Sequence, residues 1–181
     1  MFGWLRRIVG RHRVPPAPPV LRSEKRGRAF YQELADHWGA QAGQRPAREI
    51  VAREVAGLER RCRVKLPPDF RAYLFHAAPV EMLYDEHLTG WWPIARIRTV
   101  AQECEGWTEG EVGVPPAREA DAWLVFADGM IWSWAWAICC SDGPDRGRVA
   151  VIGGSDEPVV ADSFREFVLL ALEDSHRILP V

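Results

Sequence analysis

Apolar residues recur with a helical period in the N-terminal half of the chain. Phe30, Leu34 and Trp38 are spaced by four residues, which predicts a helix that begins near Ala29. An apolar stripe of period 3.6 predicts a second helix over residues 51–62. That stripe consists of Val51, Val55, Leu58 and Cys62. Each of these faces must be buried against another element of the domain.

A third helix is predicted to follow the Leu-Pro-Pro-Asp segment at residues 66–69. Proline is tolerated in the first turn of a helix, and an acidic residue is favoured at that end. The helix is therefore expected to begin at Pro68 or Asp69 and to end before Pro79. Its predicted buried face consists of Phe70, Tyr73, Leu74 and Ala77.

The periodicity of apolar residues is weaker in the middle of the chain than in the N-terminal half. Residues 80–92 indicate a strand and a turn. Beyond Pro93, four apolar residues have a spacing that favours a short helix over a strand. These residues are Ile94, Ile97, Val100 and Cys104. Residues 105–122 are predicted to form a long acidic loop, and loops of this length in compact domains are commonly functional or mobile.

Period-two patterns after residue 122 predict an antiparallel meander. Strands are expected over residues 123–127, 130–138 and 148–152, with a short edge strand over 159–161. The Asp-Gly pair at 128–129 is typical of a two-residue hairpin turn between the first two strands.

The last predicted element is a closing helix. Ser163 and Glu166 have the spacing of a capping box, with serine at the N-cap. The apolar face that follows consists of Phe164, Phe167, Val168, Ala171 and Leu172. The fold class is therefore α+β, with an antiparallel β-meander packed with N-terminal helices and a C-terminal closing helix. We expect a single domain over residues 29–181.

Three of the nine tryptophans alternate within the predicted strand 130–138. One face of that strand would carry Met130, Trp132, Trp134, Trp136 and Ile138. The opposite face would carry the smaller Ser133, Ala135 and Ala137 together with Ile131. Two interpretations stay open: the tryptophans are part of the core under the helices, or they form an exposed groove that docks a partner.

The formal net charge of -2 hides an uneven distribution. Residues 1–28 carry eight basic residues and one acidic residue, whereas residues 29–181 carry 15 basic and 24 acidic residues. The first segment is also rich in proline, so we expect a flexible arm that could tether weakly to an anionic surface. An acidic body argues against direct binding of nucleic acid and favours a basic protein partner.

Two features of the sequence indicate the cellular compartment: its four cysteines and its lack of long apolar runs. The cysteines form no Cys-x-x-Cys pair, and we expect buried free thiols in a reducing environment. No apolar run is long enough to cross a bilayer, and the first nine residues lack the apolar core of a signal peptide. We therefore expect a cytoplasmic protein.

The sequence contains no recognisable catalytic motif. It has neither a nucleophile elbow nor a phosphate-binding glycine loop. The Asp-Glu-His run at residues 85–87 is expected to be a solvated turn, because three adjacent side chains cannot all face one metal ion. Asp128 could serve as a general base, but its predicted hairpin position accounts for it. We expect no catalytic residues, no cofactor and no metal.

The order of elements and several local segments resemble the SUKH superfamily of bacterial immunity proteins and fungal Smi/Knr cell-wall regulators. The Leu-Glu pair at 58–59 followed by Leu-Pro-Pro-Asp-Phe at 66–70 is similar to one family segment. The Trp-Pro-Ile run at 92–94 and the Ser-Phe-Arg-Glu-Phe run at 163–167 are similar to two others. The match covers roughly residues 45–173, and the chain departs from it at residues 76–79, where the family commonly has Asn-Gly.

The resemblance implies a non-enzymatic role. Bacterial members mostly bind a toxin domain, often one that acts on nucleic acid, and cover its functional surface. The alternative is a regulatory or scaffolding adaptor that binds an endogenous protein, as the fungal relatives suggest.

The acidic residues of this chain could then face basic groups of a toxin, with one tryptophan as an anchor. The hypothetical partner-binding residues are Glu103, Glu105, Trp107, Glu109, Glu111, Asp142 and Asp145.

Overall fold

The computed structural model describes residues 24–105, 117–153 and 158–180, with only the backbone described for 117–119. Over these residues the chain forms an α+β fold with five α-helices and a seven-stranded antiparallel sheet. The predicted fold class is therefore confirmed. Residues 1–23, which make up most of the expected basic arm, lie outside the described part. Over the described residues, every helix is too short or too polar to cross a bilayer.

The three N-terminal helices form where the apolar periodicity predicts them. They are α1 (Gly27–Trp38), α2 (Arg48–Cys62) and α3 (Pro68–His76), with the 3-10 helix η1 (Gly39–Ala42) between the first two. All the residues predicted for the buried faces are buried. Proline occupies the first turn of α3, as predicted from its fixed backbone angle and missing N–H group.

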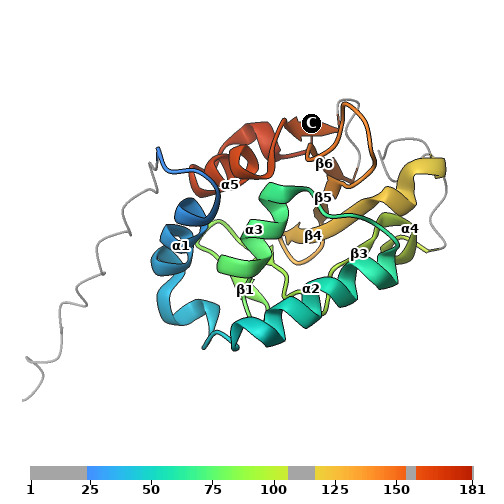
Figure 1. The fold of residues 1–181 in the computed structure, drawn as a ribbon. Helices are drawn as coiled ribbons and strands as arrows, with labels where there is room; N and C mark the ends of the chain where they lie inside the picture. The colour runs from blue at the N-terminus through green and yellow to red at the C-terminus, as the bar shows by residue number, and fades with distance from the viewer. Residues whose placement is uncertain (1–23, 106–116, 154–157, 181) are drawn as a thin grey trace, which may run out of the picture.

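The sheet contains strands from the middle and the end of the chain. They are β1 (Leu83–Tyr84), β2 (Thr89–Trp91), β3 (Arg98–Thr99), β4 (Trp123–Gly129), β5 (Trp134–Cys139), β6 (Val149–Ile152) and β7 (Val159–Ala161). Their order is β1-β2-β4-β5-β6-β7, and β3 pairs with β4 on the same edge as β2. Figure 1 shows α1, α3 and α5 together over the sheet, with α2 running along its side.

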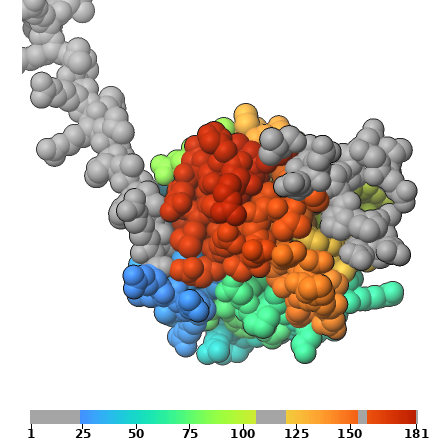
Figure 2. Space-filling view, turned by 90° about the horizontal axis from the view of Figure 1, so that it is seen from above, coloured from blue at the N-terminus to red at the C-terminus, as the bar shows by residue number. Residues whose placement is uncertain are grey.

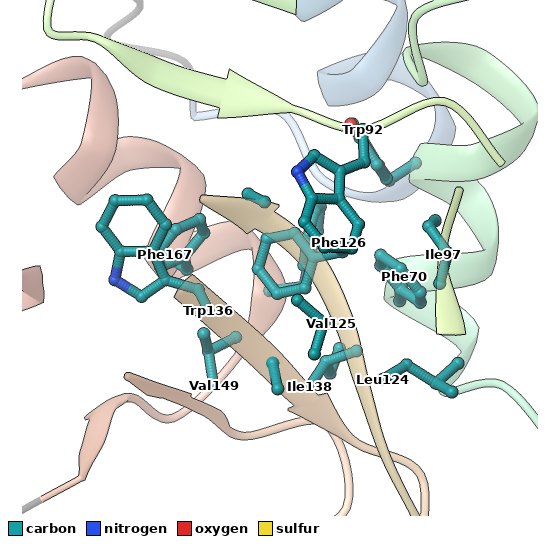
Figure 3. Packing of buried hydrophobic residues seen from close by; sticks show 14 of the residues in the cluster. Phe70, Trp92, Ile97, Leu124, Val125, Phe126, Trp136, Ile138, Val149 and Phe167 are labelled. Carbon is teal, nitrogen blue, oxygen red and sulfur yellow. The ribbon is translucent and has the colours of Figure 1, made fainter. Parts of the chain in front are cut away.

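A bulge in β4 turns an aromatic side chain into the core. The register with β5 shifts between Val125 and Ala127, so Phe126 is the additional residue. The Phe126 ring packs 5.2 Å from the ring of Phe167 and 5.6 Å from that of Phe70. Figure 3 shows Phe126 between these two rings, with Trp136 beside Phe167. The bulge therefore joins the sheet to both the third and the last helix.

The closing helix α5 (Phe164–Leu172) begins almost as predicted. Ser163 Oγ accepts a hydrogen bond from the Glu166 N–H at 3.1 Å, which is half of a capping box. The Glu166 carboxylate does not return to the backbone of Ser163 but accepts from the N–H of Asp162 at 2.9 Å. A complete capping box occurs instead at the short helix α4 (Val100–Glu103), between Thr99 and Gln102.

Three local predictions are wrong, and the first is the loop over 105–122, where residues 117–122 form the 3-10 helix η2 (Ala117–Ala122). The segment 94–97 forms a turn, so the helix expected over 94–104 shrinks to α4, which is preceded by β3. The Asp-Gly pair at 128–129 is not the hairpin turn but the paired end of β4, opposite β5. Gly129 is needed there because the Trp134 indole lies over it: a Cβ atom would meet Trp134 Nε1 at 2.2 Å.

The tryptophan stripe is consequently divided. Residues 130–133 form the loop between β4 and β5, so the strand begins only at Trp134. Trp136 lies in the core, where its Nε1 donates to the Ile178 carbonyl oxygen at 2.6 Å. Trp132 and Trp134 are partly buried. The core interpretation thus holds fully for only one of the three rings.

Replacing Phe126 with alanine would test the importance of the bulge. We expect Phe126→Ala to lower the free energy of unfolding by about 3–5 kcal/mol, because it leaves a cavity between sheet and helices. Val159→Ala on the half-exposed edge strand is the control, with an expected loss below about 1 kcal/mol. Urea denaturation measures both values, and equal losses would contradict the role given to Phe126.

Candidate functional site

Two connecting segments meet at one end of the sheet. Thr89, the first residue of β2, pairs with Gly129, the last residue of β4. The β1–β2 turn (85–88) and the β4–β5 loop (130–133) are therefore neighbours. The Met130 N–H donates to the Leu88 carbonyl oxygen at 3.2 Å, which joins the two segments directly.

Three large apolar side chains project into solvent where these segments meet. Leu88 is 53% exposed, Met130 51% and Ile131 83%. We call these three residues the apolar tip. Single exposed apolar residues are ordinary, but adjacent ones on neighbouring loops are a feature of interaction surfaces.

The backbone of the apolar tip is strained. Leu88, Met130 and Ile131 have φ angles of +61°, +48° and +56°, and Trp132 follows at +65°. A side chain in the left-handed region costs about 1–2 kcal/mol, and a β-branched residue such as Ile131 is especially rare there. Such a conformation persists only where surrounding contacts enforce it.

Asp85 enforces the conformation of the β1–β2 turn. Its Oδ1 accepts from the N–H groups of His87 at 3.0 Å and Thr89 at 2.9 Å. Its Oδ2 accepts from Trp91 Nε1 at 2.9 Å. The side chain thus ties both arms of the turn to a core tryptophan, and Leu88 is left with little freedom.

Asp128 does the same for the β4–β5 loop. This residue is only 2% exposed, and both oxygens of its carboxylate accept a hydrogen bond. Oδ2 accepts from Trp92 Nε1 at 2.6 Å, and Oδ1 accepts from the Trp132 N–H at 3.0 Å. Hydrogen bonds to a buried carboxylate are among the stronger ones in proteins, so they can offset the strain of the loop.

The contacts of Asp128 continue into a closed ring of five residues. Trp132 Nε1 donates to Glu103 Oε1 at 2.9 Å, and Glu103 pairs with Arg96 at 3.5 Å. The Arg96 guanidinium lies 4.0 Å from the centre of the Trp92 ring, which returns the path to Asp128. We call this set the Trp92–Asp128 ring.

The acidic residues predicted to bind a partner lie in different places. Glu103 is 10% exposed and is held inside the Trp92–Asp128 ring. Glu105 is exposed just after α4. Asp142 and Asp145 lie in the β5–β6 turn, where they pair with Arg146 at 3.2 Å and Arg148 at 2.9 Å, respectively.

The remaining three, Trp107, Glu109 and Glu111, lie outside the described residues. The β5–β6 turn lies at the opposite end of the sheet from the apolar tip, because β5 runs between them. The structure therefore does not join Asp142 and Asp145 to the tip.

Sequence reasoning missed the apolar tip. The alternating pattern predicts Met130 and Ile131 on opposite faces of a continuous strand, and it predicts Leu88 within a strand and turn. The available signal was the Asp-Gly pair, which did indicate a chain reversal close by. Nothing in the local sequence indicates four left-handed residues that are all apolar.

Three of the buried cysteines have thiols that are harder to ionise than an ordinary thiol. Burial raises the pKa of the Cys104 thiol to about 11, with a smaller contribution from the neighbouring Glu103. Burial also raises the pKa of Cys62 and Cys140. These three thiols are protonated at neutral pH and are poor nucleophiles. All four cysteines are free and buried, as predicted.

The Asp-Glu-His run at 85–87 is engaged in the turn. Asp85 is occupied by three N–H donors, and His87 lies between the carboxylates of Glu86 and Asp174. Among the described residues, no group of three His, Cys, Asp or Glu side chains is placed to hold a metal ion.

No protein-family model matches the chain, and no curated protein matches its sequence.

Substitution of Asp128 tests whether its carboxylate holds the loop. In Asp128→Asn the amide NH₂ group faces one of the two N–H donors, so one hydrogen bond becomes a repulsive contact. We expect the free energy of unfolding to fall by about 2–4 kcal/mol. Asp142→Asn, at an exposed position, should change it by less than about 0.5 kcal/mol. Chemical denaturation measures both, and a loss no larger than that of the control would contradict this role.

Relief of strain at Ile131 should stabilise the protein. Asparagine tolerates the left-handed region, and the exposed isoleucine has little packing to lose. We expect Ile131→Asn to raise the free energy of unfolding by up to about 1 kcal/mol. Ile50→Asn is the matched control, because Ile50 is also exposed but lies in α2. The control should gain nothing, and destabilisation by Ile131→Asn would contradict the strain argument.

Proposed function

We propose that this protein is a non-enzymatic immunity protein of SUKH type. It binds a toxin domain in a stoichiometric complex and covers the surface that the toxin needs for its activity. The observation that carries the proposal is the apolar tip, three exposed apolar side chains on a backbone that costs free energy to maintain. Strain of this kind is commonly kept where it serves recognition.

The construction of the apolar tip supports binding rather than catalysis. Its side chains are apolar, and the carboxylates beneath them, Asp85, Asp128 and Glu103, accept hydrogen bonds from indole and backbone N–H groups. Catalysis would need a polar group aimed at a substrate. Exposed apolar residues on a rigid support are instead typical of the anchor residues of protein interfaces.

The segments that resemble the SUKH superfamily support the choice of immunity protein. Each of them has a structural role: the Leu-Pro-Pro segment opens α3, Trp92 belongs to the Trp92–Asp128 ring, and Ser163 caps α5. These segments therefore build the same helix-flanked meander that the resemblance leads one to expect. The particular toxin depends on surface residues, which fold alone does not specify.

Co-expression with toxin domains tests the proposal. The first candidates are any toxin domains that are found encoded beside the gene of this chain. We expect the wild-type protein to restore growth and to inhibit the purified toxin completely at one equivalent, because it acts by occupying a surface. Ile131→Asn should reduce protection, whereas Ile50→Asn should not.

Two outcomes would contradict the proposal. An adaptor for an endogenous protein would restore growth with none of the toxin domains. An enzyme that inactivates the toxin or its product would protect at far less than one equivalent.

A further inference from the structure

Three segments that reach the end of the sheet with the apolar tip lack lysine and arginine, and the two arginines near the β4–β5 loop, Arg96 and Arg98, pair with Glu103. Residues 81–91, 127–139 and 168–176 contain no lysine or arginine. The contact between His87 Nδ1 and Asp174 Oδ2, at 3.8 Å, places the third segment beside the first. The acidic residues of these segments are Glu81, Asp85, Glu86, Asp128, Glu173 and Asp174.

Two of these carboxylates form an exposed rim beside the apolar tip. The side chains of Glu86 and Asp174 are 57% and 69% exposed. His87 lies between them, with Nε2 3.7 Å from Glu86 Oε1 and Nδ1 3.8 Å from Asp174 Oδ2. By contrast, the carboxylates of Asp85 and Asp128 accept hydrogen bonds from N–H groups inside the protein. We call Glu86 and Asp174 the acidic rim.

The opposite end of the sheet is basic. Arg60, Arg63 and Lys65 are exposed at and after the end of α2, and they make no ion pair with another described residue. Arg146 donates to the Lys65 carbonyl oxygen at 2.7 Å, which places the β5–β6 turn beside them. In Figure 2 this turn, in orange, lies against the aquamarine end of α2. Basic side chains that make no ion pair with a described residue therefore lie at the end of the sheet away from the apolar tip, near the paired Asp142 and Asp145.

We infer that the apolar tip and the acidic rim together dock a cationic protein surface that has an apolar depression at its centre. Ile131 and Met130 enter the depression, while Glu86 and Asp174 pair with lysine or arginine side chains around it. This inference rests on the proposed function and names the contact surface and the chemistry of the partner.

The charge pattern selects this occupant over a second copy of the chain. A two-fold dimer through the apolar tip would set the acidic rim against itself, and like charges across an interface are costly. A partner that normally holds an anionic substrate supplies the opposite charge. Such a partner would also be steered toward the acidic end by long-range attraction.

Binding kinetics with a defined probe test the inference. The probe is the toxin domain that the wild-type protein neutralises, with its own catalytic residue inactivated. The double variant Glu86→Lys/Asp174→Lys should slow association about tenfold or more at low salt and reduce the salt dependence. The matched control, Asp121→Lys/Asp162→Lys, makes the same change in charge at exposed positions toward the basic end. It should change the association rate less than about threefold.

The apolar part is tested separately. Ile131→Asn should raise the dissociation rate about 100-fold with little effect on association, as expected for a central anchor residue. Ile50→Asn should leave both rates within about twofold of wild type. Circular dichroism and urea denaturation of each variant exclude unfolding as the cause.

The outcomes separate the two proposals. A tight complex that is insensitive to the variants of the apolar tip and the acidic rim overturns this inference and leaves the immunity function standing. A failure to bind any toxin domain overturns the function and the inference with it. Self-association that Arg60→Glu/Arg63→Glu abolishes would show that the acidic end docks on the basic end of another copy, and would likewise overturn the inference.

Discussion

The buried carboxylate of Asp128 is the contact on which the candidate surface depends. It lies at the point where β2, β4 and the β4–β5 loop meet, and both of its oxygens accept N–H groups. A buried charge is tolerated only when it is fully hydrogen-bonded, so this single residue fixes an indole ring and a strained loop at once. Its position in turn depends on the bulge at Phe126, because a one-residue change in register moves every later side chain of β4 to the other face.

The helices contribute rigidity rather than chemistry. Aromatic rings from α3 and α5 pack around Phe126, with those of Phe164 and Phe167 edge to face and that of Phe70 tilted, and this layer leaves the Gly129 end of β4 free to present a loop. Binding through a preorganised loop loses little conformational entropy, because the ordering has already been accomplished during folding. The strain at Ile131 is consistent with this arrangement, since stability is commonly given up where a surface serves recognition.

The elements of the fold were largely predictable from the sequence. The buried faces of α1, α2, α3 and α5 follow from apolar spacing, and the meander follows from alternation and turn residues. Prediction failed at residues that are typical of a local turn but instead make contacts with distant parts of the chain. Asp128 and Gly129 have the composition of a turn, but one binds a tryptophan 36 residues away in sequence and the other makes room for the Trp134 ring. The segment 94–97 has a helical spacing, yet it turns to bring β3 against β4.

By itself, therefore, the sequence determined the buried faces of α1, α2, α3 and α5, the order of most helices and strands, and the α+β class, because these depend on periodicity within one element. Only the tertiary structure decided where the exposed apolar side chains gather and which carboxylates remain available. Leu88, Met130 and Ile131 are ordinary apolar residues until distant hydrogen bonds force their backbone into the left-handed region. Glu103 and Glu86 are indistinguishable in sequence, but one is enclosed by two arginines and an indole while the other faces solvent. Such differences arise from contacts between residues far apart in the chain, and these contacts exist only once the sheet has formed.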